Sequence, residues 1–370
     1  MQKHTLDENE LALLWLHYFA LSEKKRDAVL GLFAEPKDIF LSFDKQKDLV
    51  SSIVGHKTFE KMTQKPAKAF AQELKAKIDK LNIFVVTRAS ANYPASLREI
   101  SNAPLVLFAI GDISLLSQTL IAVVGTRKPT SYGKEVAKSF STTLAKAGVV
   151  LVSGLAYGVD CIAHMTAIEE GSKTVAVMAG GLDEIYPAAH TTLARQIVKT
   201  GGLILSEYFP GVRPTSYSFP ERNRIVSGIS DGVLVIEAGE KSGSLHTVGF
   251  AIDQGKELFV VPANINSVAS KGSNRVLVEV PHALVTEPSQ ILERLGIFAQ
   301  EERENILLSD EEKMILKVVL REPLDFDNLA QKTKIPTQNL NSLLTIMEMN
   351  GIIKRLPGNI IEATGIMEIE

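Results

Sequence analysis

Residues 121–160 read IAVVGTRKPTSYGKEVAKSFSTTLAKAGVVLVSGLAYGVD, and this stretch decides the fold. It opens with small and β-branched apolar residues at 121–124, which are typical of a strand covered on both faces of a sheet. The period then becomes helical, with one face formed by Val136, Phe140 and Leu144. Gly148 stands where a left-handed residue would end that helix, and VVLV at 149–152 predicts a second strand. The stretch is therefore a βαβ unit, whose chemistry is expected at the carboxyl ends of its strands.

The loop after the first predicted strand is GTRKP at 125–129. It lacks the G-x-G-x-x-G pattern of a dinucleotide site, and the second strand ends at Ser153, where such a site needs an acidic residue. It also lacks the Gly-Lys-Ser/Thr ending of a P-loop. A tight loop with two fixed positive charges suits a polyanion better than a nicotinamide cofactor. The alternative is that Arg127 makes only a surface ion pair.

The same alternation continues along the chain. Further strands are predicted at 174–179, 203–208, 232–238 and 257–262, with helices at 160–171 and 190–200. Two extended pieces within 83–111 are expected to add edge strands. This succession of strand, glycine and helix predicts an α/β fold, a Rossmann-like doubly wound sheet whose loops gather along one edge.

Four parts are predicted: a small helical domain of the SAM or helix-hairpin-helix kind at 1–80, a Rossmann-like core at 81–298, a charged linker at 299–308 and a winged-helix domain at 309–370. For the N-terminal helices a packing or partner role is favoured over DNA contact, because no basic helix stands out.

The predicted C-terminal helices cover 310–320, 325–333 and 337–349, and two short strands surround Pro357-Gly358. The third helix contains no Lys or Arg, which favours contact with protein over reading of duplex DNA. Lys354 and Arg355 keep DNA contact open as the alternative.

Composition limits the functional classes. The net charge of -3 and the pI near 6.2 are not those of a protein that binds nucleic acid over its whole surface, so any such site must concentrate its charge in a groove. The single cysteine, Cys161, excludes an internal disulfide and a Cys-rich zinc site. The apolar run at 11–21 is interrupted by His17 and is too short to span a bilayer. With no secretory leader evident, a cytoplasmic protein without membrane contact is expected.

The loop after the second strand is SGLAYG at 153–158. Its glycines would let a phosphate approach backbone N–H groups at a helix N-terminus, the alternative being plain turn geometry. Asp160 is expected to cap the helix that follows. His164 is interpreted as a hydrogen-bonded structural residue, because the sequence names no nucleophile for it to activate.

FPERNR at 219–224 places two arginines and an asparagine beside Phe219, just behind Tyr217. Single-stranded nucleic acid requires this combination of phosphate-binding charge and stacking surface. The alternative is an ion-pair cluster with Glu221 at the start of a helix. KSGS at 241–244 and KGSNR at 271–275 add hydroxyls, amides and cations at the same predicted edge.

Together these motifs resemble the DNA-processing protein A family, also called DprA or Smf, over essentially the whole chain. The resemblance is carried by VGTRKPTSYG at 124–133, SGLAYGVDCIAH at 153–164, GGLDEIYP at 180–187, LSEYFPG at 205–211, FPERNRIVSGIS at 219–230, VIEAGEKSGSLHT at 235–247 and KGSNRVL at 271–277. It implies a homodimer that binds single-stranded DNA and loads RecA onto incoming DNA during natural transformation, with no enzymatic activity and no cofactor. Single-strand-binding protein is a further candidate partner.

Carried over by position, the resemblance makes Arg127 the main phosphate contact. The family often has Arg at the position of Tyr157, where this chain has a side chain able to stack on a base. The residues expected to bind DNA are Gly125, Thr126, Arg127, Lys128, Ser153, Gly154, Tyr157, Gly158, Gly180, Gly181, Phe219, Arg222, Asn223, Arg224, Lys241, Ser242, Gly243, Ser244, Lys271 and Asn274.

Two other functions stay open at this point. One is an enzyme that binds nucleoside monophosphates or cleaves N-glycosidic bonds on a related fold, although the Pro-Gly-Gly-x-Gly-Thr-x-x-Glu signature of such enzymes is not reproduced at 179–181 or 239–243. The other is a transcription regulator that acts through the C-terminal module.

Overall fold

A computed structural model describes residues 5–297, 308–320, 322–350, 352–356 and 358–363. The chain forms two compact units, residues 1–299 and residues 300–370. The linker predicted at 299–308 lies outside the described residues apart from Leu308. Among the described residues, no helix has the length and apolar character needed to cross a bilayer.

The first unit is built on an eight-stranded sheet with the order β1-β2-β6-β5-β4-β3-β7-β8. Strands β3 to β8 are parallel, whereas β2 runs antiparallel to both of its neighbours, β1 and β6. The edge strands and the doubly wound α/β sheet predicted from the sequence are thereby confirmed. The strands are β1 (Phe84–Thr87), β2 (Val106–Gly111), β3 (Leu120–Val124), β4 (Val150–Ser153), β5 (Thr174–Met178), β6 (Leu203–Ser206), β7 (Gly232–Val235) and β8 (Glu257–Val260).

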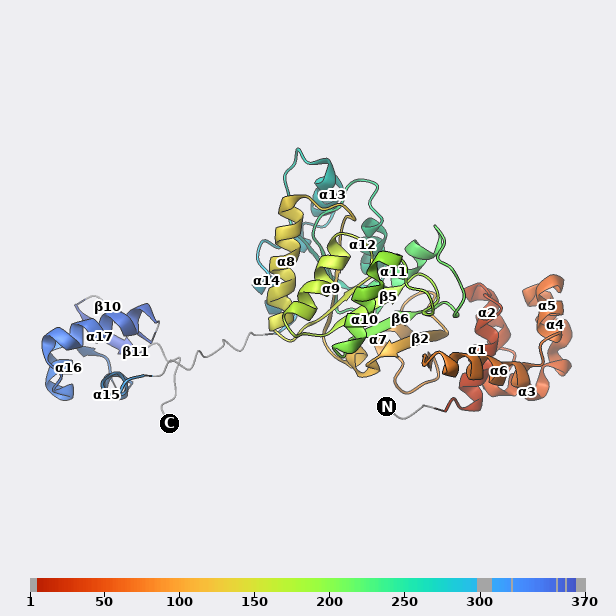
Figure 1. The fold of residues 1–370 in the computed structure, drawn as a ribbon, viewed down its shortest axis with the longest axis horizontal. Helices are drawn as coiled ribbons and strands as arrows, with labels where there is room; N and C mark the ends of the chain where they lie inside the picture. The colour runs from red at the N-terminus through yellow and green to blue at the C-terminus, as the bar shows by residue number, and fades with distance from the viewer. Residues whose placement is uncertain (1–4, 298–307, 321, 351, 357, 364–370) are drawn as a thin grey trace. The chain divides into compact units, whose positions relative to one another are not determined.

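Helices cover both faces of this sheet (Figure 1). One face carries α8 (Ser131–Lys146), α9 (Val159–Glu169), α10 (Thr191–Lys199) and α14 (Ser289–Arg294). The other carries α7 (Ala95–Arg98), α11 (Ser218–Gly228), α12 (Ser244–Asp253) and α13 (Lys271–Glu279). Successive residues of β3 alternate between the two cores: Ile121 and Val123 pack toward α8 and α9, and Ala122 and Val124 toward α11 and α12. This alternation explains the unbroken apolar run of the strand.

The predicted helix between β3 and β4 forms as α8. Phe140 and Leu144 are buried in its core-facing side, and Thr130 caps its start by accepting a hydrogen bond from the Gly133 N–H. Gly148 has φ +80°, so the predicted left-handed residue after the helix is confirmed.

The order of the strands creates a switch point beside β3. From β3 the chain proceeds through β4, β5 and β6 toward one edge, and then crosses by α11 to place β7 and β8 on the other side of β3. Strands β3 and β7 are neighbours, with Val124 opposite Val235 at their carboxyl ends. The loops that follow these two strands lead away in opposite directions, which leaves a crevice between them.

The N-terminal helices lie against the β1–β2 edge of the sheet (Figure 1). They are α1 (Glu8–His17), α2 (Glu23–Leu30), α3 (Ile39–Ser42), α4 (Lys47–Val54), α5 (His56–Thr63) and α6 (Ala67–Lys80). Trp15 is fully buried among them, in a hydrophobic cluster that also contains Phe108 of β2. This shared core joins the helices to the sheet within one compact unit.

The C-terminal unit is a winged helix, as predicted. It contains α15 (Asp310–Val319), α16 (Phe326–Thr333), α17 (Thr337–Met349), β10 (Ile353–Leu356) and β11 (Ile360–Ala363). A two-residue strand that the sequence pattern did not predict, β9 (Leu324–Asp325), pairs with β11. The same Asp325 caps α16 through the Asn328 N–H, so the helix begins at Phe326.

Candidate functional site

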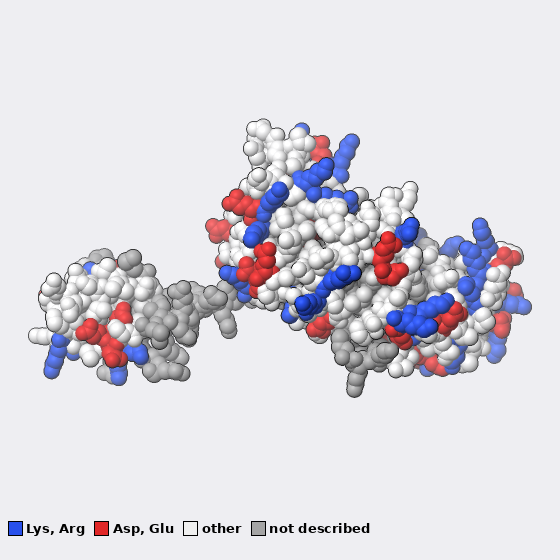
Figure 2. Space-filling model, in the orientation of Figure 1, with Lys and Arg blue, Asp and Glu red and all other residues white. Residues whose placement is uncertain are grey.

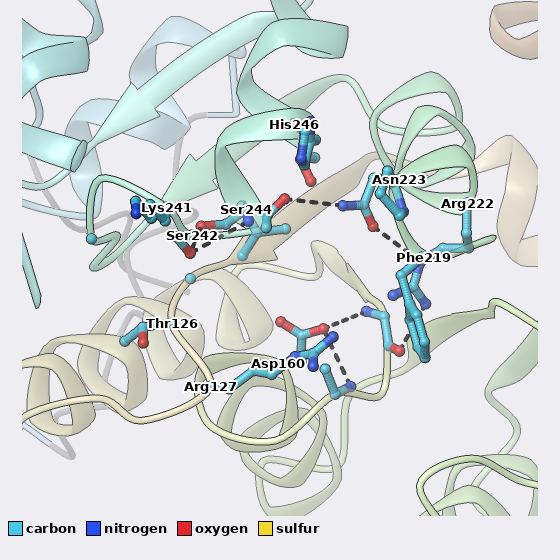
Figure 3. Close-up of a pocket in the computed structure, with 18 of the residues that line it drawn as sticks. Thr126, Arg127, Asp160, Phe219, Arg222, Asn223, Lys241, Ser242, Ser244 and His246 are labelled. Atoms are coloured by element: carbon cyan, nitrogen blue, oxygen red, sulfur yellow. Dashed lines mark hydrogen bonds between the residues drawn. The ribbon is translucent and has the colours of Figure 1, made fainter. Parts of the chain in front are cut away.

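A cavity of about 1100 Å³ opens at the carboxyl ends of β3 and β7, and we call it the strand-end pocket. Its walls come from the loops that follow strands β3 to β8 and from the first turns of α9, α11 and α12. In Figure 3, Thr126 and Arg127 approach from one side, Lys241, Ser242 and Ser244 from the opposite side, and Phe219 and Asn223 from a third. Of the predicted DNA-binding residues, those that line the pocket are Gly125, Thr126, Arg127, Lys128, Gly154, Phe219, Arg222, Asn223, Lys241, Ser242, Gly243 and Ser244.

Three of these side chains are exposed cations: Arg127, Lys128 and Lys241. Within the described part of the chain, none of them forms an ion pair with a carboxylate. On the face shown in Figure 2, positive and negative side chains are intermixed over the N-terminal helices. The lining also contains one exposed carboxylate, Glu240, so its exposed charges are three positive and one negative in a chain whose net charge is -3.

Aromatic rings lie beside these cations. The Arg127 guanidinium stands over the Phe219 ring, and the Phe219 ring centroid lies 5.6 Å from that of Tyr186. Tyr186 lines the pocket and is 53% exposed, yet sequence reasoning did not single it out. The available signal was its place in the GGLDEIYP motif, directly after a strand end.

Polar groups complete the wall opposite Arg127. The hydroxyl oxygens of Ser242 and Ser244 are 2.7 Å apart, and the Asn223 side-chain amide donates to the Gly243 carbonyl at 3.3 Å. Helix α12 starts at Ser244 without a side-chain cap, and both Gly243 and Ser244 line the pocket. The positive end of the α12 dipole therefore faces the pocket, which favours an anion there.

Arg222 lies in the pocket wall but serves a structural purpose. It is only 5% exposed, and its guanidinium donates to the carbonyl oxygens of Gly154 and Val177. Burial lowers the pKa of Arg222 to about 10, against the opposing effect of Asp160. A Cβ at Gly154 would meet this guanidinium, so glycine at this position makes room for Arg222.

Arg224 was also predicted to face the crevice, and the structure places it elsewhere. Two residues along a helix correspond to a turn of about 200°, so Arg224 projects from α11 on the side away from Arg222. It is 5% exposed and donates to both carboxylate oxygens of Glu207 at 2.7 Å. Its charge is thereby neutralised outside the pocket.

Asp160 does not cap α9 as predicted, because the cap position belongs to Gly158. The Asp160 carboxylate instead accepts the N–H groups of Gly154 at 3.0 Å and Ala156 at 3.3 Å, amides that were expected to meet a phosphate. Burial raises the pKa of Asp160, while Arg222 acts in the opposite direction. His164 is the structural residue that was predicted: it is fully buried, its Nδ1 lies 2.7 Å from the Thr174 hydroxyl, and burial lowers its pKa to about 3.

The remaining predicted residues lie outside the pocket lining. The Ser153 hydroxyl donates to the Val123 carbonyl, and the Tyr157 ring packs edge-on against His190. Asn274 exchanges two hydrogen bonds with the backbone of Ala263. The members of this set are Ser153, Tyr157, Gly158, Gly180, Gly181, Arg224, Lys271 and Asn274.

Comparison with known proteins places this site in a family. The model of the family described as DNA recombination-mediator protein A matches residues 84–296. The chain belongs to the DNA recombination-mediator protein A family. A second model, the DprA winged helix domain, matches residues 299–359 and agrees with the fold of the C-terminal unit.

Curated relatives support the assignment. Protein Smf of Escherichia coli is 35% identical over 291 residues, which cover 76% of this chain and 78% of that protein. The DNA processing protein DprA of Bacillus subtilis is 44% identical over 178 residues, covering 48% of this chain and 60% of that protein.

Two solved structures of the family share the fold. DprA from Streptococcus pneumoniae is 30% identical, covers 79% of this chain and 98% of its own, and gives a TM-score of 0.65. DprA from Helicobacter pylori is 33% identical, covers 57% of this chain and 95% of its own, and gives a TM-score of 0.51. The Helicobacter structure is described as showing that protein's single-stranded DNA binding mode.

Proposed function

We propose that the strand-end pocket binds single-stranded DNA. One observation carries the proposal: three exposed cations from two loops, Arg127 and Lys128 after β3 and Lys241 after β7, open into one cavity whose wall includes the Phe219 ring. The cations suit backbone phosphates, and the ring offers a stacking surface for a base. The binding mode described for the Helicobacter relative supports the same ligand class.

The aromatic surfaces favour a single strand over a duplex. Phe219 and Tyr186 present ring faces or edges inside a cavity, where only an unpaired base can reach them. Duplex DNA keeps its bases stacked and paired, so it would engage only the cations.

The family description supports a recombination-mediator role, and we extend it to a specific task. The chain holds incoming single-stranded DNA and loads RecA onto it during natural transformation, as a homodimer and with single-strand-binding protein as a further partner. Exposed apolar side chains suited to a subunit contact are present on the first unit, among them Ile252, Val278 and Leu284.

The role proposed here is binding without catalysis. Asp160, the buried carboxylate of the pocket, already accepts two backbone N–H groups. His164 lies fully buried with its Nδ1 bonded to Thr174. Incubation with a panel of nucleoside monophosphates, followed by chromatography, tests the enzymatic alternative, which release of free base would support.

The binding proposal is tested by fluorescence anisotropy with a labelled dT oligonucleotide. Arg127→Ala should weaken binding of single strands of any sequence, because it removes a phosphate contact. Arg195→Ala is the matched control, since Arg195 is an exposed arginine on α10 outside the pocket. Equal affinity for Arg127→Ala and the wild type would show that the pocket is not the DNA site, and tighter binding to duplex would show that the ligand class is wrong.

A further inference from the structure

Glu237 is a buried carboxylate behind the strand-end pocket that the proposed function does not use. It follows β7 by two residues and is 1% exposed. Within the described residues it forms no ion pair, although an isolated buried charge is costly unless hydrogen bonds satisfy it. The hydrogen bonds of Glu237 therefore indicate its role.

The backbone carbonyl and the carboxylate of Glu237 bond to opposite ends of the loop that carries Arg127 and Lys128, and the carboxylate also accepts the Ser270 hydroxyl at 3.4 Å. At the start of the loop, the Thr126 N–H donates to the Glu237 backbone carbonyl at 2.7 Å. At the end of the loop, the N–H and the hydroxyl of Thr130 donate to the two Glu237 carboxylate oxygens, each at 2.9 Å.

The same carboxylate connects the loop to helix α8. Because the Thr130 hydroxyl donates to Glu237, its oxygen is left to accept the Gly133 N–H at 3.1 Å, which caps the helix. A Cβ at position 133 would come within 2.4 Å of a Glu237 carboxylate oxygen, so glycine is required there. The carboxylate also lies at the positive end of α8, where a negative charge is stabilised.

We propose that Glu237 is a positioning residue for DNA binding: its carboxylate fixes the Thr130 end of the 126–130 loop and thereby helps to hold Arg127 and Lys128 in the strand-end pocket. The inference rests on the proposed function for its effect on affinity. Its structural half, the ordering of the loop, is independent of any ligand.

The direction in which a substitution changes DNA affinity distinguishes this positioning role from a purely electrostatic effect. Removing a negative charge near a phosphate site strengthens the binding of a polyanion if charge alone matters. Glu240→Gln should do so, because Glu240 is an exposed carboxylate that lines the pocket. Glu237→Ala also removes a negative charge, but it releases the Thr130 end of the loop while the backbone bond to Thr126 stays, so it should weaken binding of a dT oligonucleotide by about tenfold.

A Glu237→Gln variant and a double-mutant cycle test whether Glu237 acts through the loop cations. The amide retains one acceptor for Thr130, so Glu237→Gln should bind with an affinity between those of the wild type and Glu237→Ala. In an Arg127→Ala, Lys128→Ala background, Glu237→Ala should change affinity by less than about twofold, because the groups that it positions are gone. Thermal unfolding of each variant checks that the fold is retained.

Amide hydrogen exchange tests the structural half without DNA. In Glu237→Ala, exchange should accelerate in peptides covering 126–133, while peptides from α10 exchange as in the wild type. If Glu237→Ala leaves amide exchange in the loop unchanged, the inference is overturned. A gain in DNA affinity like that of Glu240→Gln would also overturn it, as would an equal loss of affinity in the wild-type and the Arg127→Ala, Lys128→Ala backgrounds. A wild-type chain that fails to bind DNA at all would instead refute the proposed function, and the exchange result would still decide the role of Glu237.

Discussion

The guanidinium carbon of Arg127 lies 5.4 Å from the centroid of the Phe219 ring. The two residues come from different elements, Arg127 from the loop after β3 and Phe219 from the first turn of α11. A cation over an aromatic face is stabilised by about 0.5–1 kcal/mol at an exposed site. The pair also places a cation that can bind phosphate beside a ring that can stack on a base. Every nucleotide of a DNA strand contains both a phosphate and a base.

Phe219→Ala should reduce affinity for a dT oligonucleotide by about 5- to 150-fold, the range that corresponds to about 1–3 kcal/mol for one base–aromatic stack. The measurement is anisotropy with two matched strands, one normal and one with abasic sites. The effect of Phe219→Ala should disappear with the abasic strand, whereas that of Arg127→Ala should persist. An equal loss on both strands would mean that Phe219 supports the pocket wall and does not stack on a base.

Arg224→Ala should destabilise the first unit without changing how DNA binding depends on salt. The ion pair with Glu207 is buried, and removal of one partner from such a pair costs about 3–5 kcal/mol. Urea unfolding measures this loss. The control is Arg275→Ala, which breaks an exposed pair with Glu279 and should cost less than about 1 kcal/mol. A small stability loss combined with a flatter salt dependence would identify Arg224 as a phosphate ligand after all.

The sequence located the pocket but did not assign every side chain in it. Strand ends marked by glycine predicted which loops meet, and Arg127 and Lys241 are found together there. The FPERNR motif could not show the rotational phase of α11, and that phase buries Arg222 against backbone carbonyls and turns Arg224 toward Glu207. The contacts of Glu237 depend on how a loop folds back over a strand end, which periodicity does not report.

Acid should weaken the fold through His164. Its folded pKa is about 3, below the value of about 6.5 expected in the unfolded chain, so between these values the unfolded state binds the extra proton. The free energy of unfolding should therefore fall as pH drops from about 6.5, by up to about 1.4 kcal/mol per pH unit from this group, and be unaffected by it at higher pH. His17, whose pKa burial also lowers, acts with the same sign.

Urea unfolding at several pH values tests this dependence. His164→Gln should show a shallower loss of stability in acid than the wild type. His56→Gln, at a side chain that is 82% exposed, should follow the wild-type curve. Parallel curves for His164→Gln and the wild type would show that His164 titrates alike in both states.

The wing of the C-terminal unit should not contribute to DNA affinity. Lys354 pairs with Glu362 at 2.7 Å and Arg355 with Glu348 at 3.2 Å, so both cations already have carboxylate partners. A Lys354→Ala, Arg355→Ala variant should bind single-stranded and duplex oligonucleotides within about twofold of the wild type. A larger loss of DNA affinity that increases at low salt would show that Lys354 and Arg355 contact DNA. It would contradict the interpretation that the winged-helix unit contacts protein.

The central claim is that Arg127, Lys128 and Lys241 act together on one phosphate backbone, and the salt dependence of affinity tests it most directly. Each phosphate contact on a single strand contributes a slope of about -0.7 to log affinity against log salt, so substitution of all three residues by alanine should flatten the slope by about 2. A control that replaces three exposed cations outside the pocket, Lys146, Arg195 and Lys199, should keep the wild-type slope. Parallel lines for the pocket variant and the wild type would contradict the claim.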